Sequence, residues 1–111
     1  MTKDFMSVVI PAFNEQENIK RIPKELLPVL NKMIIKYEVI IIDDGSKDDT
    51  AKEVQKIIRK YRNVRIVSHR KNMGLAEATR TSIKHLKGNI AVFLDSDFTF
   101  HPREIPKLYA K

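Results

Sequence analysis

The sequence contains no cysteine and no tryptophan, only three glycines, and no long apolar run among its 111 residues. Without cysteine, disulfide bonds and thiolate metal sites are excluded, and the composition fits a reducing compartment. Apolar stretches such as residues 39–42 are far shorter than the roughly 20 residues of a membrane-spanning helix, and the N-terminus lacks the layout of a signal peptide. Since a chain of this length buries about two thirds of its unfolded surface, we expect one soluble domain, residues 1–111, around a single core.

Several catalytic motifs are absent as well. No Gly-x-x-x-x-Gly-Lys-Ser/Thr sequence is present, which excludes a P-loop NTPase, and no Gly-x-Gly-x-x-Gly dinucleotide fingerprint follows the first apolar run. There is no Gly-x-Ser-x-Gly nucleophile elbow, and the three histidines lack a paired spacing. We interpret His69 and His85 as structural residues and keep only His101 as a candidate ligand or metal contact.

The net charge of +7 comes from one stretch of the chain, because the remaining acidic and basic residues balance. Between residues 52 and 71 there is one acid, Glu53, and eight basic residues: Lys52, Lys56, Arg59, Lys60, Arg62, Arg65, Arg70 and Lys71. Their spacing is typical of the solvated face of a surface helix, away from the acidic residues discussed below. No aromatic residues alternate with them, so we expect no nucleic-acid partner. Contact with an anionic membrane surface or an acidic partner is the alternative.

Short apolar runs alternate with amphipathic stretches along the chain. The runs predict strands at residues 6–10, 37–42, 63–67 and 89–94. The stretches between them predict helices at residues 15–33, 51–61 and 75–86, the first interrupted by Pro23 and Pro28. In the third helix the expected apolar stripe is Leu75, Ala78, Thr79, Ser82, Ile83 and Leu86, and Gly88 is placed as the glycine after its C-terminus. The order βαβαβαβ predicts an α/β fold with an open, mainly parallel, Rossmann-like sheet.

Five carboxylates follow the predicted strands, at the sheet edge where ligands bind in such folds. They are Glu15, Asp43, Asp44, Asp95 and Asp97. Crowded carboxylates need a compensating cation or hydrogen-bond donors, and an Asp-x-Asp pair after a buried strand suits Mg²⁺ or Mn²⁺ with a phosphate completing the coordination. No helix is expected directly after residues 95–97, which favours a metal role there. The segment 48–50 is instead predicted to cap the second helix, and Asp43 either caps or braces its loop or joins the site.

Four motifs together resemble the family 2 glycosyltransferases of the GT-A fold, in particular the polyprenyl (dolichyl) phosphate mannosyl- and glucosyltransferases. They are Val-Val-Ile-Pro-Ala-Phe-Asn-Glu at 8–15, Ile-Asp-Asp-Gly-Ser-Lys-Asp at 42–48, Asn-Met-Gly-Leu at 72–75 and Leu-Asp-Ser-Asp at 94–97. The resemblance extends over the whole chain but includes only the nucleotide-binding half of the family's catalytic domain. It implies binding of a UDP-sugar or GDP-sugar through Mg²⁺ or Mn²⁺ for transfer of a hexose, with a polyprenyl phosphate as the acceptor.

The resemblance also assigns residues. The substrate-binding positions it implies are Pro11, Ala12, Phe13, Glu15, Asp43, Asp44, Lys71, Asp95 and Ser96. Among them, Asp44 is similar to the aspartate that hydrogen-bonds the base, and Asp95 and Asp97 match the pair that holds the cation. Arg70 and Lys71 resemble the basic loop near the nucleotide. Mannosyl members often carry glutamine two residues after the Asp pair, where this chain has Thr99. No catalytic base is assigned, since the family's base lies in the other half of the domain, and a polyprenyl phosphate oxygen is already anionic.

The truncated sheet carries further expectations. The family's strand order leaves residues 89–94 as an exposed apolar edge, so the chain either self-associates there or is completed by the rest of the catalytic domain. We expect the isolated chain to be inactive, and the full-length protein to act at the cytoplasmic face of a membrane.

Two other functions stay open on sequence grounds. One is a non-catalytic module that binds nucleotide without transferring sugar. The other is a receiver-like phosphoacceptor domain, which fits less well because no isolated aspartate follows the third strand.

Overall fold

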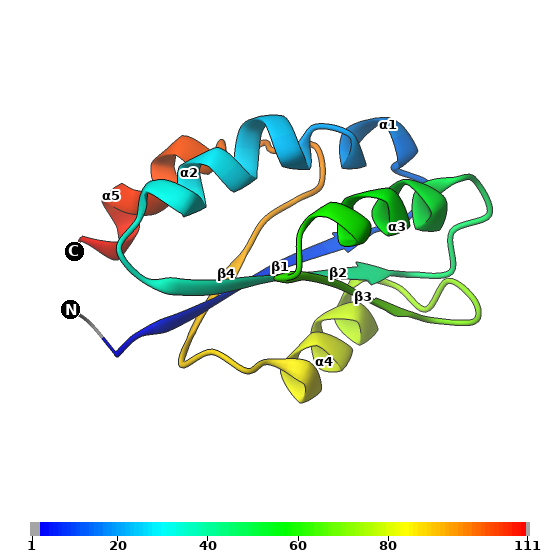
Figure 1. Cartoon of the computed structure of the whole chain (residues 1–111). Helices are drawn as coiled ribbons and strands as arrows, with labels where there is room; N and C mark the ends of the chain where they lie inside the picture. Colours follow the sequence, from blue (N-terminus) through cyan, green and yellow to red (C-terminus); the bar gives the residue numbers. More distant parts are fainter. Residues whose placement is uncertain (1–2, 111) are drawn as a thin grey trace.

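The computed structural model describes residues 3–110 and confirms the expected α/β class (Figure 1). The elements follow one another as β1 (Phe5–Ala12), α1 (Gln16–Ile19), the π-helical turn η1 (Ile22–Leu26), α2 (Leu27–Lys32), β2 (Lys36–Asp43), α3 (Thr50–Lys60), β3 (Val64–Ser68), α4 (Leu75–His85), β4 (Ile90–Phe93), the 3₁₀ turn η2 (Pro102–Glu104) and α5 (Ile105–Tyr109). None of the helices in this described part is long and apolar enough to cross a bilayer.

The sheet is parallel throughout, in the order β3-β2-β1-β4. The two central strands, β1 and β2, are almost entirely buried, as expected for β-branched runs covered on both faces. The chain proceeds from β1 to β2 and β3 on one side and returns to β4 on the other. This reversal leaves a crevice at the carboxyl ends of β1 and β4, where ligands bind in open α/β sheets.

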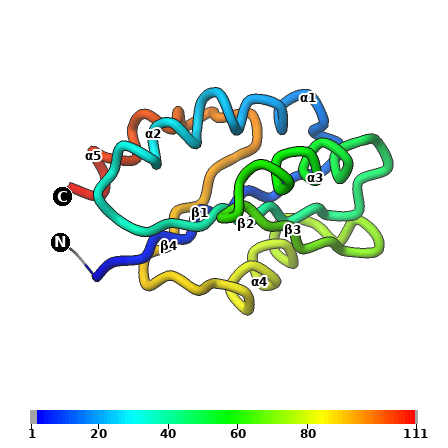
Figure 2. Tube along the Cα trace, viewed as in Figure 1, coloured from blue at the N-terminus to red at the C-terminus, as the bar shows by residue number. Residues whose placement is uncertain are grey.

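Helices cover the two faces of the sheet unequally. Figure 1 shows α1, α2, α3 and α5 on one face and α4 on the other. Figure 2 shows that after β4 the chain rises to the first face, where α5 lies beside α2. The larger core accordingly lies between the sheet and the first group, whereas the core under α4 consists of Val9, Ile40, Ile42 and Ala78.

The long first helix is divided, as the prolines predicted. Pro23 lies in η1 and Pro28 near the start of α2. At α3 the expected cap is present in a different form. Asp49 occupies the N-cap position without a side-chain cap, while the carboxylate of Asp48 accepts the N–H of Thr50 at 2.9 Å.

Two predictions about the third helix were wrong. Leu75 and Ile83 are 66% and 59% exposed, because α4 packs on the sheet through small residues such as Ala78 and Ser82. Gly88 lies beyond the end of α4 and does not cap it. A Cβ at Gly88 would lie 2.3 Å from the carbonyl oxygen of Phe5, so glycine is required by the close approach of the chain to β1.

The basic residues between positions 52 and 71 do not all belong to one surface patch, because Arg65 pairs with an interior carboxylate. Its Nε donates to Oε1 of the buried Glu38 at 2.9 Å. Burial would raise the pKa of Glu38, but the hydrogen bonds from Arg65 and from the Ser7 hydroxyl outweigh that effect and lower the pKa. Arg65 and Glu38 therefore stabilise the interior between β3 and β2, and only the other members of the stretch contribute to the surface charge.

Candidate functional site

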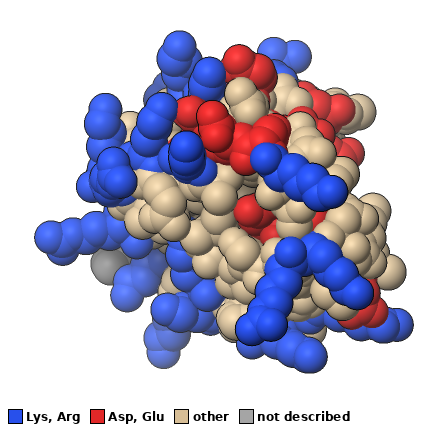
Figure 3. Space-filling view, turned by 90° about the vertical axis from the view of Figure 1, so that its right-hand side faces the viewer, with Lys and Arg blue, Asp and Glu red and all other residues tan. Residues whose placement is uncertain are grey.

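A cleft of about 360 Å³ lies at the carboxyl ends of β1 and β4. It is lined by Pro11, Ala12, Phe13, Glu15, Asp44, Asn72, Gly74, Leu75, Ala78, Asp95, Ser96 and Asp97. Figure 3 views this end of the molecule, where acidic side chains gather near the top and centre with Lys and Arg side chains around them. The tertiary structure thus brings together segments from all four of the sequence motifs.

Side-chain hydrogen bonds lock the loop after β1 to the loop after β2. The N–H of Asn14, a residue with φ of 53°, donates to the hydroxyl of Ser46 at 2.9 Å, and the N–H of Lys47 donates to Oδ1 of Asn14 at 2.9 Å. Asparagine tolerates this left-handed conformation better than most residues. The N–H of Glu15 donates to the hydroxyl of Thr50 at 2.9 Å. These bonds fix Glu15 and Phe13, the residues on either side of Asn14, at the rim of the cleft, where Phe13 is 42% exposed.

Asp44 is the most constrained carboxylate of the cleft. Oδ1 accepts the N–H of Met73 at 2.9 Å and contacts Nδ1 of His69 at 2.7 Å, while Oδ2 accepts the N–H of Gly74 at 2.9 Å and the amide of Asn72 at 3.1 Å. Burial favours a higher pKa for Asp44, but these hydrogen bonds, that of His69 first, outweigh it and lower the pKa. Since a carboxylate has about four acceptor sites, Asp44 is already saturated by the chain itself.

His69 has a role at the cleft that its sequence position did not indicate. Its side chain is only 9% exposed and lies between Asp44 and the hydroxyl of Thr81, which is 2.7 Å from Nε2. With Asp44 ionised, Nδ1 donates the proton of the shared hydrogen bond. His69, directly after β3, therefore connects the loop after β2 to α4, which agrees with its interpretation as a structural residue.

The segment after β4 presents Asp95 and Asp97 at the cleft. A turn holds it, in which the N–H of Phe98 donates to the carbonyl of Asp95 at 3.0 Å. Thr99 donates its hydroxyl and its N–H to Oδ1 of Asp97, at 2.8 and 3.0 Å. These two hydrogen bonds hold the pKa of the Asp97 carboxyl below its ordinary value, so it is ionised at neutral pH. Ser96, between the two acids, is buried.

Comparison with known proteins identifies the family of this chain. The sequence matches Glycosyl transferase family 2 over residues 7–111. The chain belongs to the family 2 glycosyltransferases. Among curated relatives, an undecaprenyl-phosphate 4-deoxy-4-formamido-L-arabinose transferase from Edwardsiella ictaluri is 34% identical over 109 residues, covering 96% of this chain and 33% of that protein. A dolichol-phosphate mannosyltransferase from Pyrococcus furiosus is 33% identical over 103 residues, covering 93% of this chain and 28% of that protein. The chain therefore spans about a third of the length of these relatives.

Solved structures place the chain in the GT-A fold of this family. Glucosyl-3-phosphoglycerate synthase from Mycobacterium tuberculosis, in complex with Mn²⁺, UDP and glucosyl-3-phosphoglycerate, superposes with a TM-score of 0.75 at 30% identity. The match covers 96% of this chain and 39% of that one. A mannosyltransferase from Pyrobaculum calidifontis, in complex with GDP-Man and Mn²⁺, has a TM-score of 0.76 at 24% identity, covering 94% of this chain and 30% of that one. The sequence-based identification of the family is confirmed.

The acidic rim of this glycosyltransferase chain is smaller than expected. Four of the five carboxylates line the cleft, but Asp43 does not. Its Oδ1 accepts the N–H of Ser46 at 3.0 Å, so it braces the loop after β2. Arg70 and Lys71 are exposed and are not among the residues that line the cleft, although the backbone of Lys71 packs against Gly45.

His101 contacts its own turn and the neighbouring η1. Its Nδ1 accepts the N–H of Arg103 and caps η2, and its Nε2 lies 3.4 Å from Oε1 of Glu25. The candidate ligand or metal contact at His101 does not line the cleft, because the turn at Pro102 directs the imidazole toward η1.

Asp95 and Asp97 suit a divalent cation that takes its remaining ligands from a substrate. Within residues 3–110, no group of three or more His, Asp or Glu side chains could hold a metal ion by itself. Mg²⁺ and similar ions usually bind one or two carboxylates, keep several waters and take further oxygens from substrate phosphates. Two carboxylates beside an open cleft fit that chemistry, whereas a cage made of protein ligands alone does not.

Proposed function

We propose that this chain is the donor-binding part of a glycosyltransferase, which binds a UDP-sugar or GDP-sugar with Mg²⁺ or Mn²⁺ and transfers a hexose to a polyprenyl phosphate. The observation that carries the proposal is the cleft itself. It combines an apolar wall, an exposed aromatic ring and a carboxylate pair at the carboxyl ends of β1 and β4. The names of the relatives support the acceptor class, and the bound ligands of the neighbours support the donor class.

Each part of the cleft has a chemical role in this proposal. Pro11, Ala12 and Phe13 offer an apolar surface to the base, and Glu15 offers a carboxylate to the ribose hydroxyls. Asp95 and Asp97 would hold the cation on the diphosphate, with Asp95 on the side of the sugar. A bound cation neutralises the negative charge that develops on the departing nucleoside diphosphate. Because a phosphate acceptor is already anionic, this chain needs no strong general base.

The role of Asp44 in base recognition depends on its existing hydrogen bonds. All of its acceptor sites are taken by donors of the chain, and the amide of Asn72, at 3.1 Å, makes the longest of the bonds to Oδ2. We propose that a base N–H displaces this amide. Lys71 is proposed to reach the nucleotide from the exposed loop beside Gly45.

Calorimetric titration of the 111-residue chain with UDP- and GDP-sugars, with and without Mn²⁺, tests this function. We expect saturable binding that requires Mn²⁺ and is abolished by a chelator. Absence of metal-dependent binding would refute the proposed site. Transfer of sugar to a polyprenyl phosphate by the isolated chain would show that turnover needs nothing more. Binding without transfer, by the whole protein as well, would favour a nucleotide-binding module.

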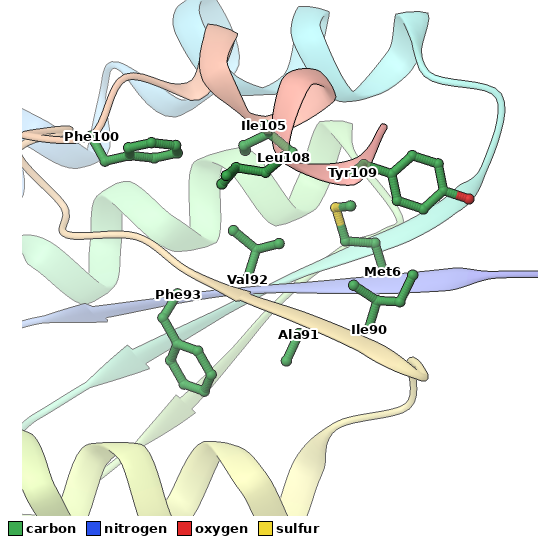
Figure 4. Close-up of a pocket in the computed structure, with 9 residues that line it drawn as sticks. All are labelled: Met6, Ile90, Ala91, Val92, Phe93, Phe100, Ile105, Leu108 and Tyr109. Carbon is green, nitrogen blue, oxygen red and sulfur yellow. The ribbon is translucent and has the colours of Figure 1, made fainter. Parts of the chain in front are cut away.

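The edge of β4 is a second surface for which we propose a partner, a second copy of this chain. β4 pairs with β1 on one side and lies at the edge of the described sheet. A cavity of about 480 Å³ separates it from α5, and Figure 4 shows Ile90 and Val92 pointing toward α5 while Ala91 and Phe93 point to the opposite face. No charge or proline interrupts residues 89–94, so the edge lacks the usual protection against pairing.

Antiparallel pairing of two such edges also matches charges. In such a pair, Lys87, which precedes the edge strand in one copy, lies near Asp95, which follows the edge strand in the second copy. We expect sedimentation equilibrium to show a concentration-dependent dimer that Ala91→Lys abolishes, because a charged edge position opposes strand addition. A monomer at high concentration, for the unsubstituted chain, would contradict this pairing.

A further inference from the structure

A residue in a strained backbone conformation directly follows the Asp95–Asp97 segment. Phe98 has φ of 54° and is 5% exposed. A bulky residue in this left-handed region is a genuine outlier, and such strain persists only where the surroundings overdetermine it. Some neighbouring group must therefore hold Phe98 in this conformation.

Arg21 meets this segment from the link between α1 and η1. Its Nη1 donates to the carbonyl oxygen of Asp97 at 2.8 Å, and its guanidinium carbon lies 5.0 Å from the centre of the Phe98 ring. The first contact fixes the backbone of Asp97, and the second covers the ring of the strained residue. A cation over an aromatic ring at this distance is attractive.

The remaining donors of Arg21 are anchored. Nε and Nη2 donate to the two carboxylate oxygens of Glu25, at 2.5 and 3.0 Å. This pairing raises the pKa of Arg21 and lowers that of Glu25, whose Oε1 also faces His101. The forked contact fixes the plane of the guanidinium, so its position at Asp97 is set by η1 and not by the loop.

We infer that Arg21 is a positioning residue for the cation site: it fixes the backbone at Asp97 and Phe98 so that the carboxylates of Asp95 and Asp97 are held in the geometry that binds the cation. The inference rests on the proposed function for the identity of the ligand. Thr99 acts on the same segment from the other side, since it orients Oδ1 of Asp97. The backbone is thus held by Arg21 and the side chain by Thr99.

Arg21→Met and Arg21→Lys test the inference in the 111-residue chain. Manganese binding is measured by the electron paramagnetic resonance signal of free Mn²⁺, well below the melting temperature. Loss of a residue that orients metal ligands typically costs about 10- to 100-fold in metal affinity, so we expect about a tenfold loss in Arg21→Met. Lysine keeps the positive charge but lacks the forked guanidinium, so the Mn²⁺ affinity of Arg21→Lys is expected to be little better than that of Arg21→Met. Arg80→Met, which removes an exposed arginine paired with Glu77, is the matched control and should leave affinity unchanged.

Hydrogen exchange without metal gives an independent readout. We expect the amides of residues 96–99 to exchange faster in both Arg21 variants and at the ordinary rate in Arg80→Met. If Arg21→Met lowered the melting temperature but left the Mn²⁺ affinity unchanged, Arg21 would only stabilise the fold, and the inference would be overturned. If the unsubstituted chain bound no Mn²⁺, the proposed function would fail. Separately, an unchanged hydrogen-exchange rate of residues 96–99 in the Arg21 variants would refute the role of Arg21.

Discussion

Asp97→Asn is expected to abolish metal-dependent nucleotide binding while leaving the fold intact. An amide carries no negative charge, so one of the two proposed cation ligands is lost. Residues that merely orient ligands change metal affinity by about 10- to 100-fold, and removal of a ligand should match or exceed the upper end, about 100-fold. Electron paramagnetic resonance of Mn²⁺ and calorimetry with UDP measure the loss.

The matched control is Asp49→Asn, at an exposed carboxylate outside the cleft that makes no side-chain cap to α3. It should bind metal and nucleotide as the unsubstituted chain does. Because Asp97 is exposed, the melting temperature of Asp97→Asn should stay close to that of the control. Equal Mn²⁺ affinity in the two variants would show that Asp97 is not a ligand of the cation.

Gly45→Ala is expected to cause the largest loss of stability. Gly45 has φ of 72°, and a Cβ there would lie 2.2 Å from the carbonyl carbon of Lys71. The left-handed conformation costs about 1–2 kcal/mol for alanine. Overpacking against backbone adds about 1–3 kcal/mol. For a domain of this size the melting temperature should fall by about 10 °C or more.

Gly74→Ala separates the two causes. Gly74 also has a positive φ, of 92°, but no atom lies within 4 Å of a Cβ built there. Its ψ of 166° lies in a region essentially restricted to glycine, which costs alanine about 1–3 kcal/mol. Only this conformational cost applies, so thermal denaturation should show a smaller loss than in Gly45→Ala, where overpacking adds to it. A larger loss in Gly74→Ala than in Gly45→Ala would contradict this expectation.

The strands and the cleft segments could be predicted from the sequence because local patterns encode them. Continuous β-branched runs mark buried parallel strands, and the acidic motifs follow directly after them. The predicted apolar stripe of α4 was wrong because the sequence pattern alone does not reveal how much of the sheet lies under a helix. Leu75 and Ile83 have the right spacing, but within residues 3–110 α4 is the only helix on its face of the sheet, so they have no helix to pack against.

The roles of Arg21 and His69 could not be predicted, since each acts on a group distant in the sequence. Arg21 contacts a carbonyl 76 residues away, and His69 contacts a carboxylate 25 residues away. Neither residue belongs to a recognisable motif. An arginine near a helix or a histidine after a strand is compatible with many partners.

The sequence by itself determined the family, the α/β class and the segments that carry the carboxylates, because these depend on local pattern and on motif order. Only the tertiary structure decided which carboxylates face the cleft and which are already used by the chain. Asp43 and Asp44 are adjacent, yet one braces its own loop and the other is saturated by the loop before α4. The physical reason is that hydrogen-bond partners are set by contacts between distant segments, which form only when the sheet brings its loops together.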